Sequence, residues 1–148
     1  MLRYTIPLAP VSKKNSQRIL VNRKTGKPFV APSQAYKNFE TSAGYFLRPK
    51  PKEPIQRPVT VKAVFYMATR RRVDLTNLLE AIDDTLVHWG ILEDDHSGIV
   101  VSHDGSRVLY DKNRPRVEVE IEEDGYECKK SEGDLGKAQK MDEYGARR

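Results

Sequence analysis

The stretch RRRVDLTNLLEAIDDTLVHWGILEDD, residues 70–95, decides the fold of this chain. At 100° per residue its large apolar side chains fall on one broad face, which predicts an amphipathic helix that turns this face to the core; they are Leu75, Leu78, Leu79, Ile82, Leu86 and Trp89. We expect Asp74 at the helix start, where a carboxylate interacts well with the helix dipole, and Gly90 at its end. Arginines precede this helix and acids follow it.

Strands are predicted both before and after this helix in the sequence. Val59–Met67 is the strongest, and its second face is partly apolar too, which predicts a central strand covered on both faces. Arg116–Glu122 alternates strictly and predicts a strand with one wet face, and Arg3–Leu8 predicts another. Two shorter β-rich runs flank Asp104-Gly105, a pair that favours a hairpin between residues 98 and 110.

The remaining elements complete a small domain. Ile19–Asn22 and Pro28–Val30 predict a second hairpin with a basic turn, and Ser33 is expected to cap a second helix. The apolar stripe of that helix is Tyr36, Phe39, Ala43 and Phe46. We therefore expect an α/β (α+β) fold, a single domain over residues 1–123 with a mixed β-sheet and two main helices, followed by a polar, flexible tail over 124–148.

Composition excludes several classes of protein. No segment approaches the roughly 18 consecutive apolar residues of a membrane span. The first residues lack the charged-then-apolar layout of a signal peptide. Cys128 is the single cysteine, so no internal disulfide can form, and a cytoplasmic location is expected.

Charge is spread unevenly and favours a polyanionic partner. Residues 1–50 carry ten Lys or Arg against one acid, whereas residues 51–100 carry six against eight. A basic surface beside an acidic one suits nucleic acid that one surface binds and another processes, although solubility alone also explains such a pattern. The candidate DNA-contacting residues are Lys13, Lys14, Arg18, Arg70, Arg71 and Arg72.

Acidic residues on and after the helix predict a metal site. Glu80 and Asp84 are four residues apart on one helix face, where like charges destabilise the helix unless a cation lies near. Asp74 and Asp95 would approach each other if the helix packs along the preceding strand. Carboxylate oxygens suit Mg²⁺. The alternative is that these acids only cap a helix and decorate a loop, and spacing leaves both readings open.

Several fixed offsets support a comparison with a known family. The run Arg70-Arg71-Arg72-x-Asp74-x-x-Asn77-Leu78-Leu79, then Asp84-x-Leu86, then Gly90-x-Leu92-x-Asp94-Asp95 resembles the RusA family of Holliday junction resolvases, which is common in phages and prophages. Ile6-Pro7 and Pro10-x-Ser12 are also similar. The resemblance covers about residues 3–122.

This resemblance implies a small α/β homodimer in a bacterial host. It implies one Mg²⁺-dependent site per subunit, with Mn²⁺ as a substitute, and paired nicks in a four-way DNA junction during recombination and repair. Asp74 and Asp95 then correspond to catalytic residues that bind the metal, and Asp84 is a further metal ligand in the same motif.

Two positions depart from the family motif. Thr76 stands where a second Asp is usual, and Glu80 stands where a Lys is usual. Glu80 could replace the missing carboxylate as a catalytic residue, and Arg70–Arg72 or Lys13 and Lys14 could replace the missing cation. The alternative function is a catalytically impaired protein that binds branched DNA, and a Mg²⁺ nuclease without junction preference is a third option.

Overall fold

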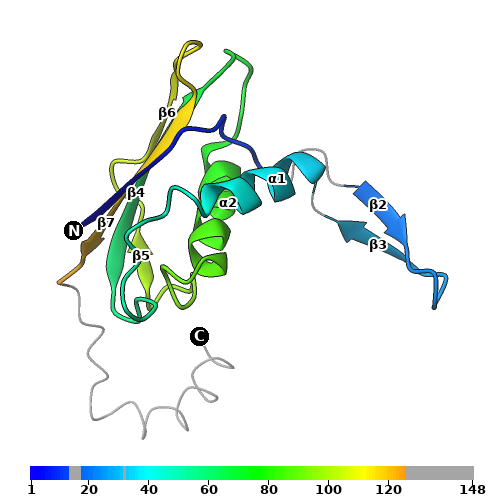
Figure 1. The fold of residues 1–148 in the computed structure, drawn as a ribbon, viewed down its shortest axis with the longest axis horizontal. Helices are drawn as coiled ribbons and strands as arrows, with labels where there is room; N and C mark the ends of the chain where they lie inside the picture. The colour runs from blue at the N-terminus through cyan, green and yellow to red at the C-terminus, as the bar shows by residue number, and fades with distance from the viewer. Residues whose placement is uncertain (14–17, 32, 126–148) are drawn as a thin grey trace, which may run out of the picture.

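A five-stranded mixed sheet carries two helices on one face, and a two-stranded hairpin extends away from this body (Figure 1). The computed structural model describes residues 1–13, 18–31 and 33–125. Strands β1 (Leu2–Ile6), β7 (Arg116–Glu123) and β4 (Val59–Met67) lie side by side, and β5 (Val100–Ser102) and β6 (Arg107–Tyr110) share the far side of β4. This architecture confirms the predicted α/β (α+β) class with a mixed sheet and two helices.

Strand β4 is the centre of the sheet. It pairs antiparallel with β7 on one side and parallel with β5 and β6 on the other. Its odd-numbered residues Val59, Val61, Ala63 and Phe65 are buried under the helices, whereas the residues between them are only half-buried. The predicted cover on both faces is not found within residues 1–13, 18–31 and 33–125, where the second face of β4 stays half-buried and the Tyr66 ring lies 3.7 Å from the Arg116 guanidinium.

Strands β5 and β6 do not form the predicted hairpin. Both run in the same direction along β4, as two pieces of one interrupted edge. At the interruption His103 Nδ1 lies 2.8 Å from the Val61 carbonyl oxygen, and the Ala63 amide donates to Ser106 Oγ at 3.0 Å. The prediction failed because Asp104-Gly105 signals a local turn, here with Gly105 at φ 83°, but does not say which strand the chain joins next.

Helix α2 (Leu75–His88) follows β4 and packs back against the sheet. Asp74 is its N-cap residue, and Gly90 at φ 75° turns the chain just beyond the Trp89 C-cap, as predicted. The buried residues of the helix include an acid within the predicted apolar face; they are Leu78, Ala81, Ile82, Asp83, Thr85 and Leu86. Ile91 and Leu92 are also buried, and the Ile91 carbonyl accepts from Ile55 at 3.0 Å, which ties the proline-rich linker to this end of the helix.

Helix α1 (Gln34–Ala43) and the hairpin begin as predicted. Ser33 Oγ accepts from the Tyr36 amide at 3.1 Å, as an N-cap should. Tyr36, Phe39 and Ala43 are buried, but Phe46 lies beyond the helix end and is 39% exposed. Strands β2 (Arg18–Val21) and β3 (Pro28–Ala31) pair antiparallel around a turn at Gly26.

Two further predictions concern the C-terminal tail and membrane-spanning segments. The predicted flexible tail begins at Asp124, whose amide donates to the Pro58 carbonyl oxygen at 2.9 Å, and from residue 126 on it lies outside the described residues. Neither of the two helices in the described ranges is long and apolar enough to cross a membrane.

Candidate active site and nucleic-acid surface

Lys13 and Asp84 form the best-defined ion pair at the acidic face of α2. Lys13 Nζ lies 2.7 Å from Asp84 Oδ2 and 5.5 Å from the centre of the Tyr36 ring. The hydrogen bond to Asp84 raises the pKa of Lys13, and the charges of Glu40 and Glu80 add to this shift. Lys13 therefore brings a permanent positive charge from the N-terminal segment to the face that carries Glu80 and Asp84.

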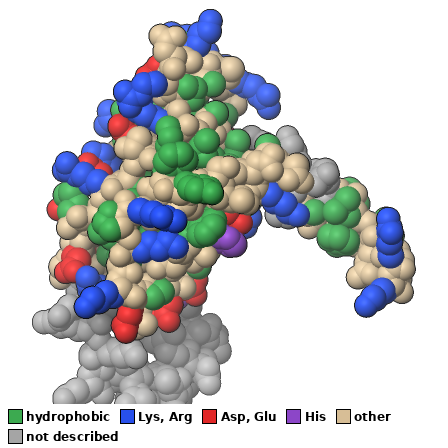
Figure 2. Space-filling model, viewed as in Figure 1, with side chains coloured by type: hydrophobic (Ala, Val, Ile, Leu, Met, Phe, Trp, Pro, Cys, Tyr) green, Lys and Arg blue, Asp and Glu red, His purple; other side chains and the backbone are tan. Residues whose placement is uncertain are grey.

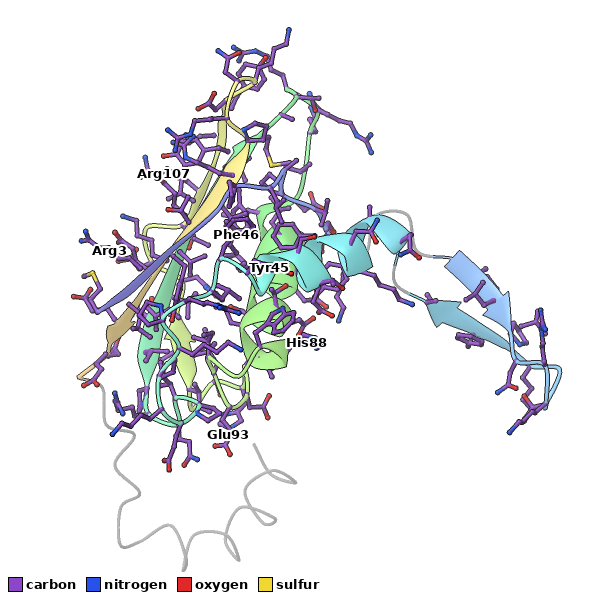
Figure 3. All side chains as sticks on the ribbon, in the orientation of Figure 1. Arg3, Tyr45, Phe46, His88, Glu93 and Arg107 are labelled. Atoms are coloured by element: carbon purple, nitrogen blue, oxygen red, sulfur yellow. The ribbon has the colours of Figure 1, made fainter. Side chains whose placement is uncertain are left out.

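Asp95 lies in electrostatic range of the same helix face. Its side chain is exposed, and its amide donates to Asp94 Oδ1 at 2.8 Å. Partial desolvation raises the pKa of the Asp95 carboxyl, and the negative charges of Asp84 and Asp83 raise it further. Lys13 and Asp84 are thus in direct contact, and Asp95 lies in the loop after α2, where the charge of Asp84 acts on it. Figure 3 marks this end of α2, where Glu93 begins the acidic loop.

Asp74 lies at the other end of the helix. It precedes Asp84 by ten positions, and at 1.5 Å per residue this corresponds to roughly 15 Å along the axis. Its carboxylate makes no capping bond, but Oδ2 accepts from Asn77 Nδ2 at 3.3 Å. A metal ion bound by Asp84 is therefore out of reach of Asp74 in the same chain.

A buried Asp–His pair, absent from the predicted site, adjoins this cluster. His103 Nε2 lies 2.9 Å from Asp83 Oδ2, while Asp83 Oδ1 is buried with no hydrogen-bond partner among the described residues. Burial raises the pKa of Asp83, and the hydrogen bond to Asp83 raises the pKa of His103. The sequence held a signal for this pair, because Asp83 lies at the edge of the apolar face of α2, four residues after Leu79 and three before Leu86.

The three predicted arginines are exposed in the loop between β4 and α2. The Arg70 guanidinium stacks 4.1 Å from the Tyr110 ring, which anchors this loop to β6. The turn between β6 and β7 lies at the same end of the sheet, since the Asp111 amide donates to the Met67 carbonyl oxygen at 3.0 Å. That turn adds exposed Lys112 and Arg114, which were not predicted.

Figure 2 shows Lys and Arg side chains at the end of the sheet and at the tip of the hairpin, and others over the body between them. Of the other predicted DNA-contacting residues, Lys13 pairs with Asp84, and Arg18 belongs to β2. Lys14 lies outside the described residues.

One protein-family model, described as Endodeoxyribonuclease RusA, matches residues 7–122. The chain belongs to the RusA endodeoxyribonuclease family. The match spans every candidate residue from Lys13 to Asp95, together with the hairpin and both helices. None of the curated proteins matches the chain. As a member of the RusA family the protein is a nuclease, and its macromolecular partner is DNA.

The carboxylates of this RusA chain suit a magnesium ion. Within residues 1–13, 18–31 and 33–125, no group of three or more His, Cys, Asp or Glu side chains could hold a metal. Mg²⁺, however, keeps several waters and commonly takes only one or two protein carboxylates. Asp84 and Asp95 could supply two such groups, and a divalent cation would reduce the repulsion that, after desolvation, contributes to the raised pKa of Asp95.

Proposed function

We propose that this protein is a Mg²⁺-dependent endonuclease that resolves four-way DNA junctions by paired nicks during recombination and repair, and that it acts as a homodimer. Membership of an endodeoxyribonuclease family supports hydrolysis of DNA. The proposal is supported by the acids on and after α2, Glu80, Asp84 and the exposed Asp95, in a chain whose exposed arginine loop precedes the same helix.

In this proposal, metal binding lies toward the C-terminal end of α2 and DNA contact at its N-terminal end. Asp84 and Asp95 would hold Mg²⁺, which lowers the pKa of an attacking water and neutralises charge on the phosphate. Lys13 limits the repulsion between the acids and offers a cation to the phosphate when a metal takes its place on Asp84. Arg70–Arg72 contact the DNA backbone, and Asp74 lies beside them.

A junction-cleavage assay tests this function. Purified protein is incubated with a four-way junction carrying a label on each strand in turn, with Mg²⁺, Mn²⁺ or EDTA. We expect paired nicks on opposed strands with either metal, and at least a ~100-fold loss of rate for Asp95→Asn and for Asp74→Asn. Asp104→Asn, a change of an exposed acid in the β5–β6 connection, is the matched control and should cut at the wild-type rate.

The results separate the proposal from its alternatives. Equal cleavage of linear, flapped and four-way DNA would mean a nuclease without junction preference. No cleavage with any divalent ion, combined with salt-sensitive junction binding, would mean the catalytically impaired binding protein. Two observations favour that second candidate: Asp84 is already engaged by Lys13 at 2.7 Å, and Thr76 stands where the resemblance implies a carboxylate.

A further inference from the structure

A cavity of about 230 Å³ lies at the N-terminal end of α2. Three segments that are far apart in the sequence line it: residues 10–12 of the N-terminal segment, the start of α1 with its N-cap, and the stretch that leads from β4 into α2 (Figure 1). Val73 and Leu78 are among its lining residues, and Asp74 lies between them in the chain. The cavity therefore adjoins the arginine loop and the helix start that carries Asp74.

Apolar side chains form most of the lining of this cavity. Val11 contributes from the N-terminal segment, Met67 from the end of β4 and Leu78 from the first turn of α2. Such surface packs well against the flat face of a ring, and small-molecule sites are lined mainly by side chains of this kind.

Hydroxyl groups and one cation supply the polar part of the lining. Ser12 and Ser33 are only 7% and 4% exposed, and they are two of the four polar or charged residues that are buried in the described parts of the chain. Thr69 and Arg71 are exposed and line the cavity from the loop. Hydroxyls donate and accept hydrogen bonds, whereas a guanidinium only donates, so this lining suits a ring edge that presents both kinds of group.

The size of the cavity fits one nucleobase. Sites for drug-sized ligands have volumes of roughly 300–1,000 Å³, so a cavity of about 230 Å³ suits a smaller, compact group. Enzymes that act on an extruded base hold it between apolar or aromatic side chains and bind its edge by hydrogen bonds. The lining of this cavity combines these two features.

The position of the cavity indicates DNA as the source of that base. DNA is the macromolecular partner of the family, and the exposed run Arg70–Arg72, part of which lines the cavity, supplies positive charge for phosphates. At the branch point of a four-way junction the strands change partners. A base there has a less continuous stack, so its extrusion costs less free energy than extrusion from within a duplex.

We propose that this cavity, here called the base pocket, receives one unstacked base of the branched DNA, next to the phosphate that the arginine loop contacts. The proposal rests on the proposed function, which supplies the branched DNA. It gives the protein a contact with a base, in addition to the contacts that its arginines make with the backbone.

The test fills the base pocket and leaves the core unchanged. Ala35→Leu and Thr69→Leu each place a larger side chain at an exposed residue of the lining, one on α1 and the other in the loop. Thr41→Leu, at an exposed residue of α1 outside the lining, is the matched control. Thermal melting checks that the three variants fold.

The readout is the fluorescence of 2-aminopurine, which rises when this base leaves the stack. It replaces one base at a time around the branch point of a four-way junction, and binding is measured in EDTA so that no strand is cut. We expect wild type and Thr41→Leu to raise the fluorescence at one defined position, and both filling variants to lose this rise. No rise with wild type, or an equal rise with the filling variants, overturns the proposal.

A junction that lacks the base at this position tests the same contact from the side of the DNA. Fluorescence anisotropy should show that the filling variants bind the intact junction about 10-fold more weakly than wild type does, because the contacts to the base are lost. On the junction without the base, wild type and the filling variants should bind equally. A filling variant that weakens binding to both junctions by the same factor contradicts the proposal, since the lost contact would not be with the base.

Cleavage with Mg²⁺ is scored separately. A protein that unstacks the base but cuts no strand refutes the proposed function and leaves the base pocket standing. Paired nicks by wild type without a change in fluorescence at any position refute the base pocket and leave the proposed function standing.

Discussion

Lys13 carries a charge that the family motif usually places on the helix itself. The family resemblance implies a Lys at the position of Glu80, and here the ammonium of Lys13 reaches Asp84 on the same helix face from the N-terminal segment. The charge of Glu80 acts on Lys13, and we propose that Lys13 supplies the cation that the motif has on the helix.

If Lys13 supplies this cation, a lysine at position 80 should restore activity that is lost when Lys13 is replaced. Lys13→Met should lower the single-turnover rate of junction cleavage by about 100-fold, because the cation that stabilises phosphate charge is lost. Adding Glu80→Lys should restore at least a tenth of the rate, since it returns a cation to the same face. Lys52→Met, in the exposed linker, serves as the control. If the double variant is no faster than Lys13→Met, Lys13 does not perform the role of the missing lysine.

The pair of His103 and Asp83 makes stability depend on pH. The hydrogen bond to Asp83 raises the pKa of His103, so the folded state holds its proton more tightly than the unfolded state. The resulting stabilisation is fully present below the unfolded value of about 6.5 and is lost as pH rises through the higher folded value. Burial raises the pKa of Asp83, which gives a slope of the same sign at lower pH.

We therefore expect the free energy of unfolding of wild type to fall as pH rises above about 6.5 and through the raised folded pKa of His103. His103→Gln should be about 2 kcal/mol less stable at pH 6, less than the loss at a fully buried pair because His103 is partly exposed, and its profile should be flatter. Urea unfolding at half-unit pH steps measures both curves. Parallel curves for the two proteins would show that another group sets the slope.

At the scale of elements, the contact between the ends of α1 and α2 fixes how the helices lie on the sheet. Trp89 Nε1 donates to the Glu40 carbonyl oxygen at 2.7 Å, and the indole ring lies across Gly44 at the C-cap of α1. A β-carbon on Gly44 would come within 2.5 Å of two ring carbons of Trp89. Gly44 has φ −57°, so a side chain is excluded there by space and not by backbone conformation.

Gly44→Ala should therefore destabilise the protein by about 1–3 kcal/mol through overpacking. The indole must move, so its fluorescence maximum should shift, and it is the single tryptophan of the chain. Gly125→Ala, whose β-carbon would meet no atom within 4 Å, should leave the melting temperature unchanged. An unchanged melting temperature for Gly44→Ala would mean that the two helix ends are not in this contact.

For the whole molecule, the sequence predicted what local periodicity determines. The apolar stripe of α2 and the alternation along β4 and β7 record which side of each element is buried, and all three form as expected. What depends on contacts between distant segments was not predictable in this way. The Asp104-Gly105 pair gives a turn but not a neighbour, and nothing local reveals that Lys13 meets Asp84, 71 residues away.

The candidate site shows the same difference between local sequence signals and contacts between distant segments. Asp74, Asp84 and Asp95 stand out by residue type and family motif, and their roles stay predictions. Their distances depend on where a 14-residue helix puts its two ends, and this places Asp74 away from Asp84. Asp83 was visible as an acid in an apolar stripe, but its partner His103 lies in a segment that only the folded sheet brings near.

The broken edge of the sheet protects the protein against aggregation. An unbroken edge strand offers a row of free amides and carbonyls to which another chain can add. Here the side chains of His103 and Ser106 interrupt the pairing along β4, so β5 and β6 are only three and four residues long and offer no continuous template. The opposite edge, β1, has five residues and is followed by Pro7, which has no amide hydrogen to donate. The interrupted edge formed by β5 and β6 therefore gives an added strand only short stretches to pair with.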